Sequence, residues 1–153
     1  MSAIQYAYAR WARKRLPLPT EQQVAELESR LGVELPEDYR QYLLEFNGGV
    51  FDNPEIVSPD EQCPGRGLET MYGVASPIES AELGKPWEIA LFDDNDPLIA
   101  LPIGDTAFGD LIILSTAPEN FGAIFFKQAS GGWFELAEGI EEFFANLREP
   151  DWG

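Results

Sequence analysis

The stretch Leu31–Gly49 (LGVELPEDYRQYLLEFNGG) specifies one helix from its beginning to its end. Pro36 suits the first helical position, where its missing N–H breaks no hydrogen bond. Apolar side chains then recur at i, i+3, i+4 and i+7 and define one buried face: Tyr39, Tyr42, Leu43 and Phe46. Asn47 and Gly48 tolerate the left-handed conformation that ends a helix. Because none of these side chains is chemically reactive, the stretch predicts a scaffold element.

The N-terminal segment predicts a basic amphipathic helix over Ser2–Leu16. Its apolar stripe contains Ile4, Tyr8 and Trp11, and it carries four of the chain's ten basic residues and no acid: Arg10, Arg13, Lys14 and Arg15. It could be a partner-binding arm or a membrane-surface helix. We favour a helix docked on the body of the protein, because the stripe needs burial and the rest of the chain is acidic. Because Leu16–Pro19 has the composition of a stiff linker, we expect the chain to divide into an arm, residues 1–19, and a domain, residues 20–153.

The sequence patterns of the domain, residues 20–153, predict an α+β fold. Thr20 and Gln23 form a capping box for a helix that ends at Gly32. Residues 50–68 are irregular, with a short strand allowed near Glu55–Val57. Later segments predict a short helix from Ser76 and a final helix over Gly139–Leu147. Apolar runs predict further strands: Leu68–Val74, Trp87–Phe92, Leu98–Ile103, Asp110–Leu114, Phe121–Phe126 and Trp133–Ala137. We expect a mostly antiparallel sheet of about five to six strands, flanked by N-terminal helices and a C-terminal helix.

Composition excludes several classes of function. The 153-residue chain has a net charge of −17, which disfavours nucleic acid or an anionic membrane as the partner. It contains no histidine, so Ser-His-Asp and Cys-His catalysis and the commonest zinc ligand are absent. The single cysteine, Cys63, can form no internal disulfide, and we interpret it as an incidental thiol. We therefore expect a cytoplasmic protein without cofactor or metal, with no secretory signal and no transmembrane helix.

Two acidic clusters are the candidate contacts for a partner. The denser one contains Asp93, Asp94 and Asp96. A calcium loop would need a glycine and a later glutamate at fixed spacing, and Pro97 and Leu98 follow instead. The second cluster lies in the irregular loop and contains Glu55, Asp60 and Glu61. Solvated acidic turns are the alternative interpretation of both clusters.

Three motifs in order resemble the SUKH superfamily, Smi/Knr type: Leu31–Gly49, LPIGDTAFGDLIIL (Leu101–Leu114), and GAIFF (Gly122–Phe126) followed by FELAEGIEEFFANL (Phe134–Leu147). The resemblance covers roughly residues 20–147 and implies an α+β fold with a mostly antiparallel sheet. It also implies that Leu35, Pro36, Tyr39 and the Asn47–Gly49 exit are mainly structural, as are Gly104, Asp105, Gly109 and Asp110 in the strand connection. Glu138 and Gly139 stand where proteins of this superfamily commonly have a small polar pair that caps the last helix, so the sequence departs from the family pattern there. The basic N-terminal helix lies outside the resemblance.

Most bacterial proteins of this superfamily resemble immunity proteins, which bind and neutralise a cognate toxin, often a nuclease. The resemblance therefore implies a non-catalytic protein whose partner is a basic toxin domain. The alternative is a scaffold or regulator of the fungal cell-wall-assembly type, which binds a housekeeping partner. The fungal proteins have long disordered flanks, which this sequence does not show, so we expect the compact bacterial type. An enzyme with paired carboxylates, such as Asp105 and Asp110, is a third hypothesis, which would require a pocket and one raised pKa.

Overall fold

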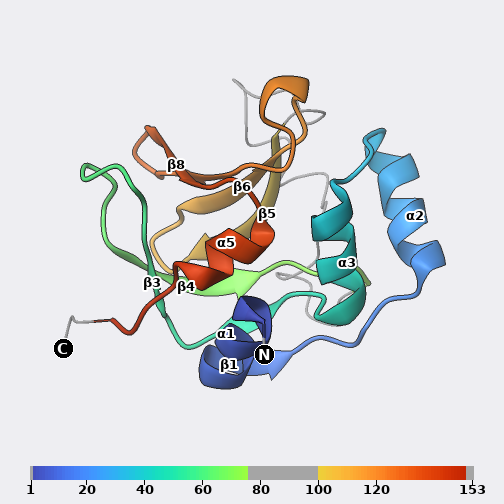
Figure 1. The fold of residues 1–153 in the computed structure, drawn as a ribbon, viewed down its shortest axis with the longest axis horizontal. Coiled ribbons are helices and arrows are strands. Elements are labelled where there is room, and N and C mark those ends of the chain that lie inside the picture. The colour runs from blue at the N-terminus through green and yellow to red at the C-terminus, as the bar shows by residue number, and fades with distance from the viewer. Residues whose placement is uncertain (1, 76–99, 151–153) are drawn as a thin grey trace.

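The computed structural model describes residues 2–75 and 100–150, which form an α+β fold (Figure 1). The α-helices in these ranges are α1 (Ala3–Trp11), α2 (Glu21–Leu31), α3 (Glu37–Glu45) and α5 (Ile140–Ala145), and a 3-10 turn η2 spans Pro118–Asn120. The strands are β1 (Ala12–Arg15), β2 (Gly49–Phe51), β3 (Glu55–Ile56), β4 (Arg66–Met71), β5 (Ala100–Thr106), β6 (Leu111–Ser115), β7 (Ile124–Lys127) and β8 (Trp133–Ala137). The predicted class, with N-terminal helices and a C-terminal helix, is confirmed.

The strands pair in the order β1-β2-β4-β5-β6-β7-β8. Strand β3 is not part of this order and pairs only with β4 among the described strands. Every pairing among the described strands is antiparallel, as predicted. Residues 2–75 and 100–150 contribute eight strands to the sheet, instead of about five to six as expected. The strands not predicted are β1 and β2, because β2 has only three residues and β1 lies in a segment with helical periodicity.

The predicted helix over Ser2–Leu16 is wrong in its second half. Helix α1 ends at Trp11, and the backbone turns to an extended conformation at Ala12. Strand β1 then pairs with β2 and forms an edge of the sheet. Its exposed basic side chains suit an edge strand, since charges there discourage pairing with another chain. The first half of the prediction is confirmed, because α1 is docked on the body by its apolar stripe.

The helix ends follow the sequence signals closely. Thr20 and Gln23 form the predicted capping box at α2, and Gly32 ends this helix in the left-handed conformation. Pro36 lies one position earlier than predicted, as the N-cap of α3, and Glu37 is the first helical residue. Gly139 caps α5 without a side-chain hydrogen bond. This agrees with the loss of a polar capping side chain at that position.

The exit of α3 connects three segments of the chain. Asn47 and Gly48 have φ values of 55° and 77°, as predicted for a left-handed helix end. The buried Asn47 side chain donates from Nδ2 to the carbonyl oxygens of Pro17 and Val74, and its Oδ1 accepts from the Val74 amide. Position 48 requires glycine for two reasons. Its φ lies in the left-handed region, and a Cβ there would lie 2.4 Å from the Met71 carbonyl oxygen.

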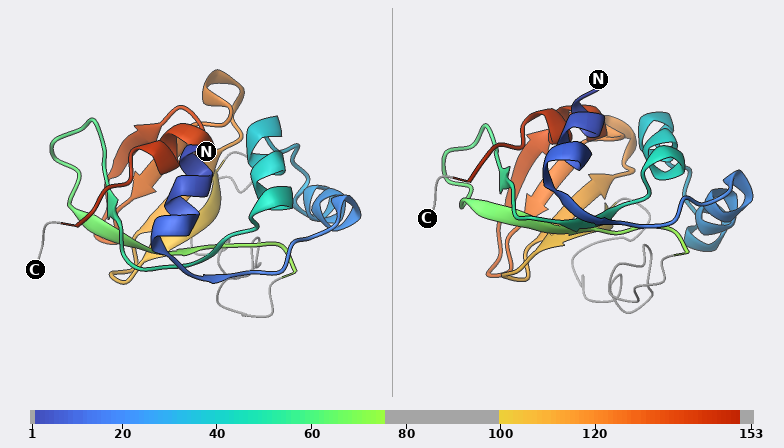
Figure 2. Two further views of the ribbon diagram at one scale, coloured as in Figure 1. Left: turned by 60° about the horizontal axis from the view of Figure 1, so that its bottom comes forward. Right: turned by 90° about the horizontal axis from the view of Figure 1, so that it is seen from below.

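An aromatic core joins three helices to the sheet. Figure 2 shows α1, α3 and α5 above the same face of the sheet, with α2 outside α3. Tyr8 packs against Tyr42, Phe51 and Phe144, with ring centroids 5.0–6.3 Å apart. The Tyr8 and Tyr42 hydroxyls are 2.7 Å apart, and Tyr8 donates to the Gly48 carbonyl oxygen. These buried rings contribute a large share of the hydrophobic stabilisation.

Several predicted features lie outside the described residues. They are the short helix from Ser76, the apolar run Trp87–Phe92 and the acidic cluster Asp93–Asp96. The connection predicted over residues 104–109 is shorter than expected, because Gly104, Asp105 and Thr106 belong to β5.

Candidate functional site

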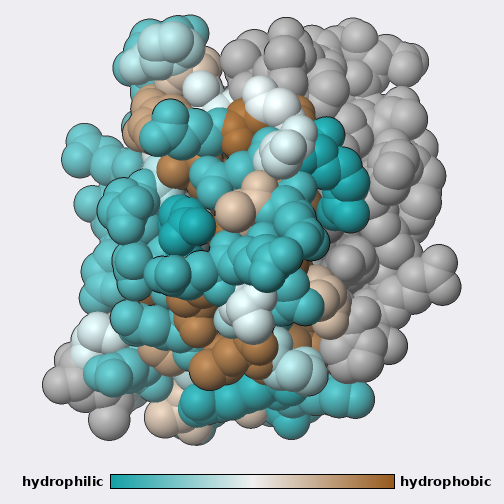
Figure 3. All heavy atoms as spheres, turned by 90° about the vertical axis from the view of Figure 1, so that its right-hand side faces the viewer, coloured by the Kyte–Doolittle hydropathy of each residue, from teal (hydrophilic) through white to brown (hydrophobic). Residues whose placement is uncertain are grey.

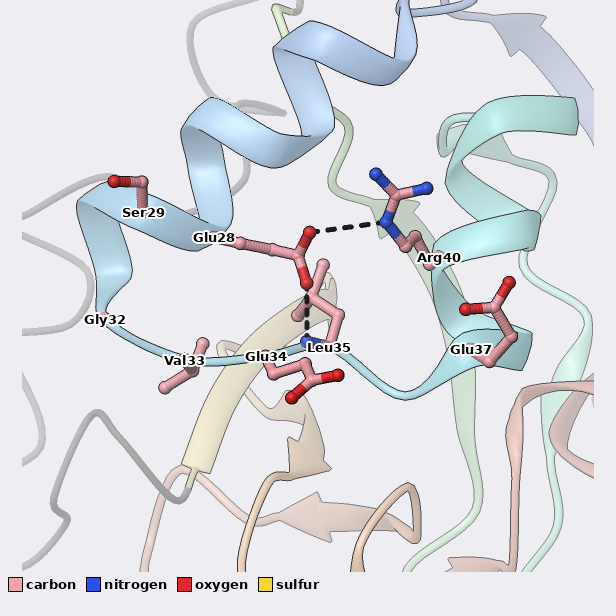
Figure 4. A pocket seen from close by; sticks show the side chains of 8 residues that line it. All are labelled: Glu28, Ser29, Gly32, Val33, Glu34, Leu35, Glu37 and Arg40. Atoms are coloured by element: carbon pink, nitrogen blue, oxygen red, sulfur yellow. Dashed lines mark hydrogen bonds and ion pairs between the residues drawn. The ribbon is translucent and has the colours of Figure 1, made fainter.

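A polar hollow lies between α2 and α3 (Figure 4). Its volume is about 520 Å³, and its lining residues are Glu28, Ser29, Gly32, Val33, Glu34, Leu35, Glu37 and Arg40. Glu28 extends from α2 toward α3, where Oε1 lies 3.3 Å from Arg40 Nε and Oε2 accepts from the Leu35 amide at 2.9 Å. Glu28 therefore connects the two helices, and its charge is balanced by Arg40. Glu34 and Glu37 remain exposed at the rim.

On the side of the molecule that carries α2 and α3, hydrophilic residues cover much of the described surface, with apolar patches between them (Figure 3). Exposed acids on α2, on α3 and between them include Glu21, Glu26, Glu34, Glu37, Asp38 and Glu45. Glu37 and Asp38 also stand in the first turn of α3, where negative charge interacts favourably with the helix dipole. This face can attract a cationic surface, and among its described residues no nucleophile is paired with a base.

The predicted contacts of the irregular loop have different positions in the structure. Asp60 and Glu61 are exposed, and Asp60 Oδ1 accepts from the Gln62 amide. Glu55 is only 7% exposed, and its Oε1 lies 2.6 Å from Arg148 Nε. Glu55 therefore has a role within the fold, which corrects its interpretation as an exposed contact. The cluster Asp93–Asp96 lies outside the described residues.

Three loops converge at the end of the sheet away from α2, and we call this region the loop end: residues 57–65, 106–110 and 128–132. Figures 1 and 2 show the three loops on the same side of the molecule. Asp110, only 1% exposed, links the 106–110 turn to the 128–132 turn and to Arg66 on β4, the strand that follows loop 57–65. Its Oδ2 accepts from Thr106 Oγ1 at 2.8 Å and lies 3.1 Å from Arg66 Nε, and its Oδ1 accepts from the Ala129 amide at 2.9 Å. The Asp110 carboxylate is thus fully engaged in positioning the loop end.

Phe108 projects from the turn that Asp110 holds. Its side chain is 70% exposed, and the Arg66 guanidinium lies over its ring, 4.7 Å from the centroid. Beside it is a hollow of about 410 Å³, lined by Asn53, Gly65, Arg66, Gly67, Ala107 and Phe108. Phe108 was not predicted as a functional residue, because the surrounding motif was interpreted through its glycines and aspartates, which have structural roles. An aromatic residue at a turn between two strands was the signal that could have identified it.

The carboxylate pair Asp105 and Asp110 meets only one of the two requirements for an enzyme, a raised pKa, because neither residue lines the hollow between α2 and α3 or the hollow beside Phe108. Burial raises the pKa of Asp105 to about 6, and the negative charge of Glu69 acts in the same direction. The second carboxylate of the hypothetical pair, Asp110, has both oxygens engaged. Burial raises the pKa of the Cys63 thiol to about 11, so it is protonated at neutral pH. Within residues 2–75 and 100–150, His, Cys, Asp and Glu side chains form no group able to hold a metal ion.

The helices described by the structure include none with the length and apolar character needed to cross a membrane.

Comparison with known proteins gives one family match. Residues 18–146 match the model of the SMI1/KNR4 family (SUKH-1). The chain is also similar to the SPbeta prophage-derived uncharacterized protein YokK of Bacillus subtilis (strain 168). The two sequences are 27% identical over an alignment of 152 residues. The match covers 86% of this chain and 76% of YokK. No solved structure shows significant similarity to the chain.

Proposed function

This chain belongs to the SMI1/KNR4 family (SUKH-1), and on that premise we propose that it is an immunity protein. It binds a cognate toxin domain of a polymorphic or contact-dependent toxin system in the cytoplasm and neutralises it without catalysis. The family match over residues 18–146 carries this proposal, because the family is associated with immunity proteins of toxin systems.

The charge of the chain supports a basic toxin domain, such as a nuclease, as the partner. A net charge of −17 produces an attractive potential that accelerates encounter with a cationic protein. Exposed carboxylates also resemble the phosphates that a nuclease binds. Among the described residues we propose Asp60 and Glu61 as contacts, and we extend the proposal to the cluster Asp93–Asp96.

The proposed contribution of the cluster Asp93–Asp96 is testable by charge reversal. Lysine at Asp93, Asp94 and Asp96 should slow association with the toxin domain most at low salt, where electrostatic attraction is least screened. An unchanged association rate would remove this cluster from the interface.

The alternative regulator with an N-terminal binding arm has less support. Tyr8 and Trp11, which form the apolar stripe of that arm, are 1% and 6% exposed because they pack in the core. The arm could bind a housekeeping partner through this stripe only if it left the fold.

Co-expression tests the proposal directly. A candidate toxin domain would be taken from a gene adjacent to this one and expressed in a bacterial host with or without this chain, and growth would be measured. We expect the chain to restore growth and to copurify with the toxin domain. Continued growth arrest in cells that contain the folded chain would contradict the proposal.

A further inference from the structure

The turn that carries Phe108 is unusually well fixed for an exposed loop. Within it, the Phe108 amide donates to Thr106 Oγ1 at 3.2 Å and the Gly109 amide to the Thr106 carbonyl oxygen at 3.2 Å. The Thr106 amide donates to the Asp110 carbonyl oxygen at 3.1 Å. Outside the turn, the buried Asp110 carboxylate bonds to Arg66 on β4 and to Ala129 in the β7–β8 turn. Bonds from the end of β5, from β4 and from the β7–β8 turn thus fix the backbone at residue 108.

This rigid support displays a side chain that contributes little to folding. Phe108 is the most exposed of the large apolar side chains in the described part of the chain, and the Arg66 guanidinium lies over its ring. The rings of the core, by contrast, are almost fully buried. Rigid exposed aromatic side chains are typical anchors of protein interfaces, because they lose little conformational entropy on binding.

The surroundings of Phe108 indicate the chemistry of a partner. The adjacent hollow of about 410 Å³ has space for a side chain from the partner. Asp60 and Glu61 are exposed in the neighbouring loop, and both Asp60 and Arg66 lie close enough to Cys63 to affect its pKa. Arg66 is already paired with Asp110, so the unpaired charge at this place is acidic. An apolar anchor beside acidic residues fits an apolar pocket that is bordered by lysine or arginine.

We infer that the loop end is the toxin-binding surface and that Phe108 is its central anchor. Phe108 enters an apolar pocket of a basic protein, while Asp60 and Glu61 face the cationic border of that pocket. This inference rests on the proposed function. A second copy of the chain is the wrong occupant, because two molecules that each carry a charge of −17 repel one another.

Binding of a catalytically inactivated form of the neighbouring toxin domain tests the inference. We expect F108A to weaken affinity by at least about tenfold, F108L to have an intermediate effect, and both variants to keep the thermal midpoint of the wild type. The matched control is F121A, which removes another exposed phenylalanine, 49% exposed, from the opposite end of the sheet. F121A should change affinity by less than about twofold.

The possible results separate this inference from the proposed function. If the wild type binds and F108A binds equally well, Phe108 is not the anchor, while the immunity function stands. If the wild type itself neither binds the toxin domain nor protects cells, the proposed function fails and the inference fails with it. Sedimentation of the wild type as a dimer and of F108A as a monomer would overturn the inference by identifying a second copy as the occupant.

Discussion

Asn47 illustrates how one polar side chain can determine the course of the backbone. Its side chain forms three hydrogen bonds, of 2.7, 2.9 and 2.7 Å, to backbone groups from two distant segments. The residue is completely buried, so water cannot replace these partners if the side chain is removed.

We predict that N47A lowers the free energy of unfolding by about 2–4 kcal/mol, because it leaves buried backbone groups of Val74 without partners. Asn53 provides the control, since it also has a φ of 55° but is exposed. N53A should cost about 1 kcal/mol or less. Urea denaturation measures both variants, and equal losses would show that backbone conformation, not hydrogen bonding, explains the requirement for Asn47.

Asp105 gives the fold a pH dependence of known sign. Its folded-state pKa, raised by burial to about 6, exceeds its unfolded value of 3.8, so the folded state binds the proton more tightly. Its contribution to stability is therefore full below about pH 4 and is lost as pH rises through about 6.

D105N should become progressively more stable relative to the wild type as pH rises from about 4 to about 7, by about 1–2 kcal/mol in total. The measurement is the free energy of unfolding from urea titrations at several pH values. A difference between the two proteins that stays constant over this range would contradict the assignment to Asp105.

At the scale of elements, the N-terminal arm is part of the fold. Helix α1 packs against α5, the Ala3 amide donates to Glu141 Oε1, and β1 pairs with β2. The division of the chain at residue 19 stays a prediction, but the arm and the domain share one core and one sheet.

Deletion of residues 2–16 should therefore unfold the protein, because it removes Tyr8 and Trp11 from the aromatic core and exposes strand β2. Far-UV circular dichroism and dispersion of amide NMR signals would report the loss. A folded deletion variant that has lost only partner binding would instead identify the arm as a separate interface.

The elements that sequence analysis predicted are those with local signals. The capping box of α2 and the glycine that ends it depend on neighbouring residues, and both are confirmed. Strand β1 was missed because its pairing with Gly49–Phe51, which lies far away in sequence, overrides the helical periodicity of the arm. The same limit applies to the candidate site. Asp60 is exposed and stays a predicted contact, whereas Glu55 is buried and pairs with Arg148, 93 residues later, which no local signal indicates.

At the scale of the whole molecule, the net charge is the dominant property. Beyond the arm the chain has six basic and 27 acidic residues, so this part of the molecule carries a large excess of negative charge. Such a field acts mainly on the rate of association and is screened by salt.

Charge reversal at the loop end should therefore change kinetics more than stability. The double variant D60K/E61K should associate with the toxin domain about tenfold more slowly at low salt, and this difference should shrink as salt is added. The control is E21K/E26K, which makes the same change in net charge on α2. Equal slowing by both variants in stopped-flow measurements would show that only the total charge matters and not its position.

Calorimetric titration of the purified chain with the inactivated toxin domain encoded beside its gene tests the immunity function most directly. We expect a saturable 1:1 complex that prevents the active toxin domain from acting on its substrate. Absence of binding heat at several temperatures, together with full toxin activity in the presence of excess folded chain, would contradict it.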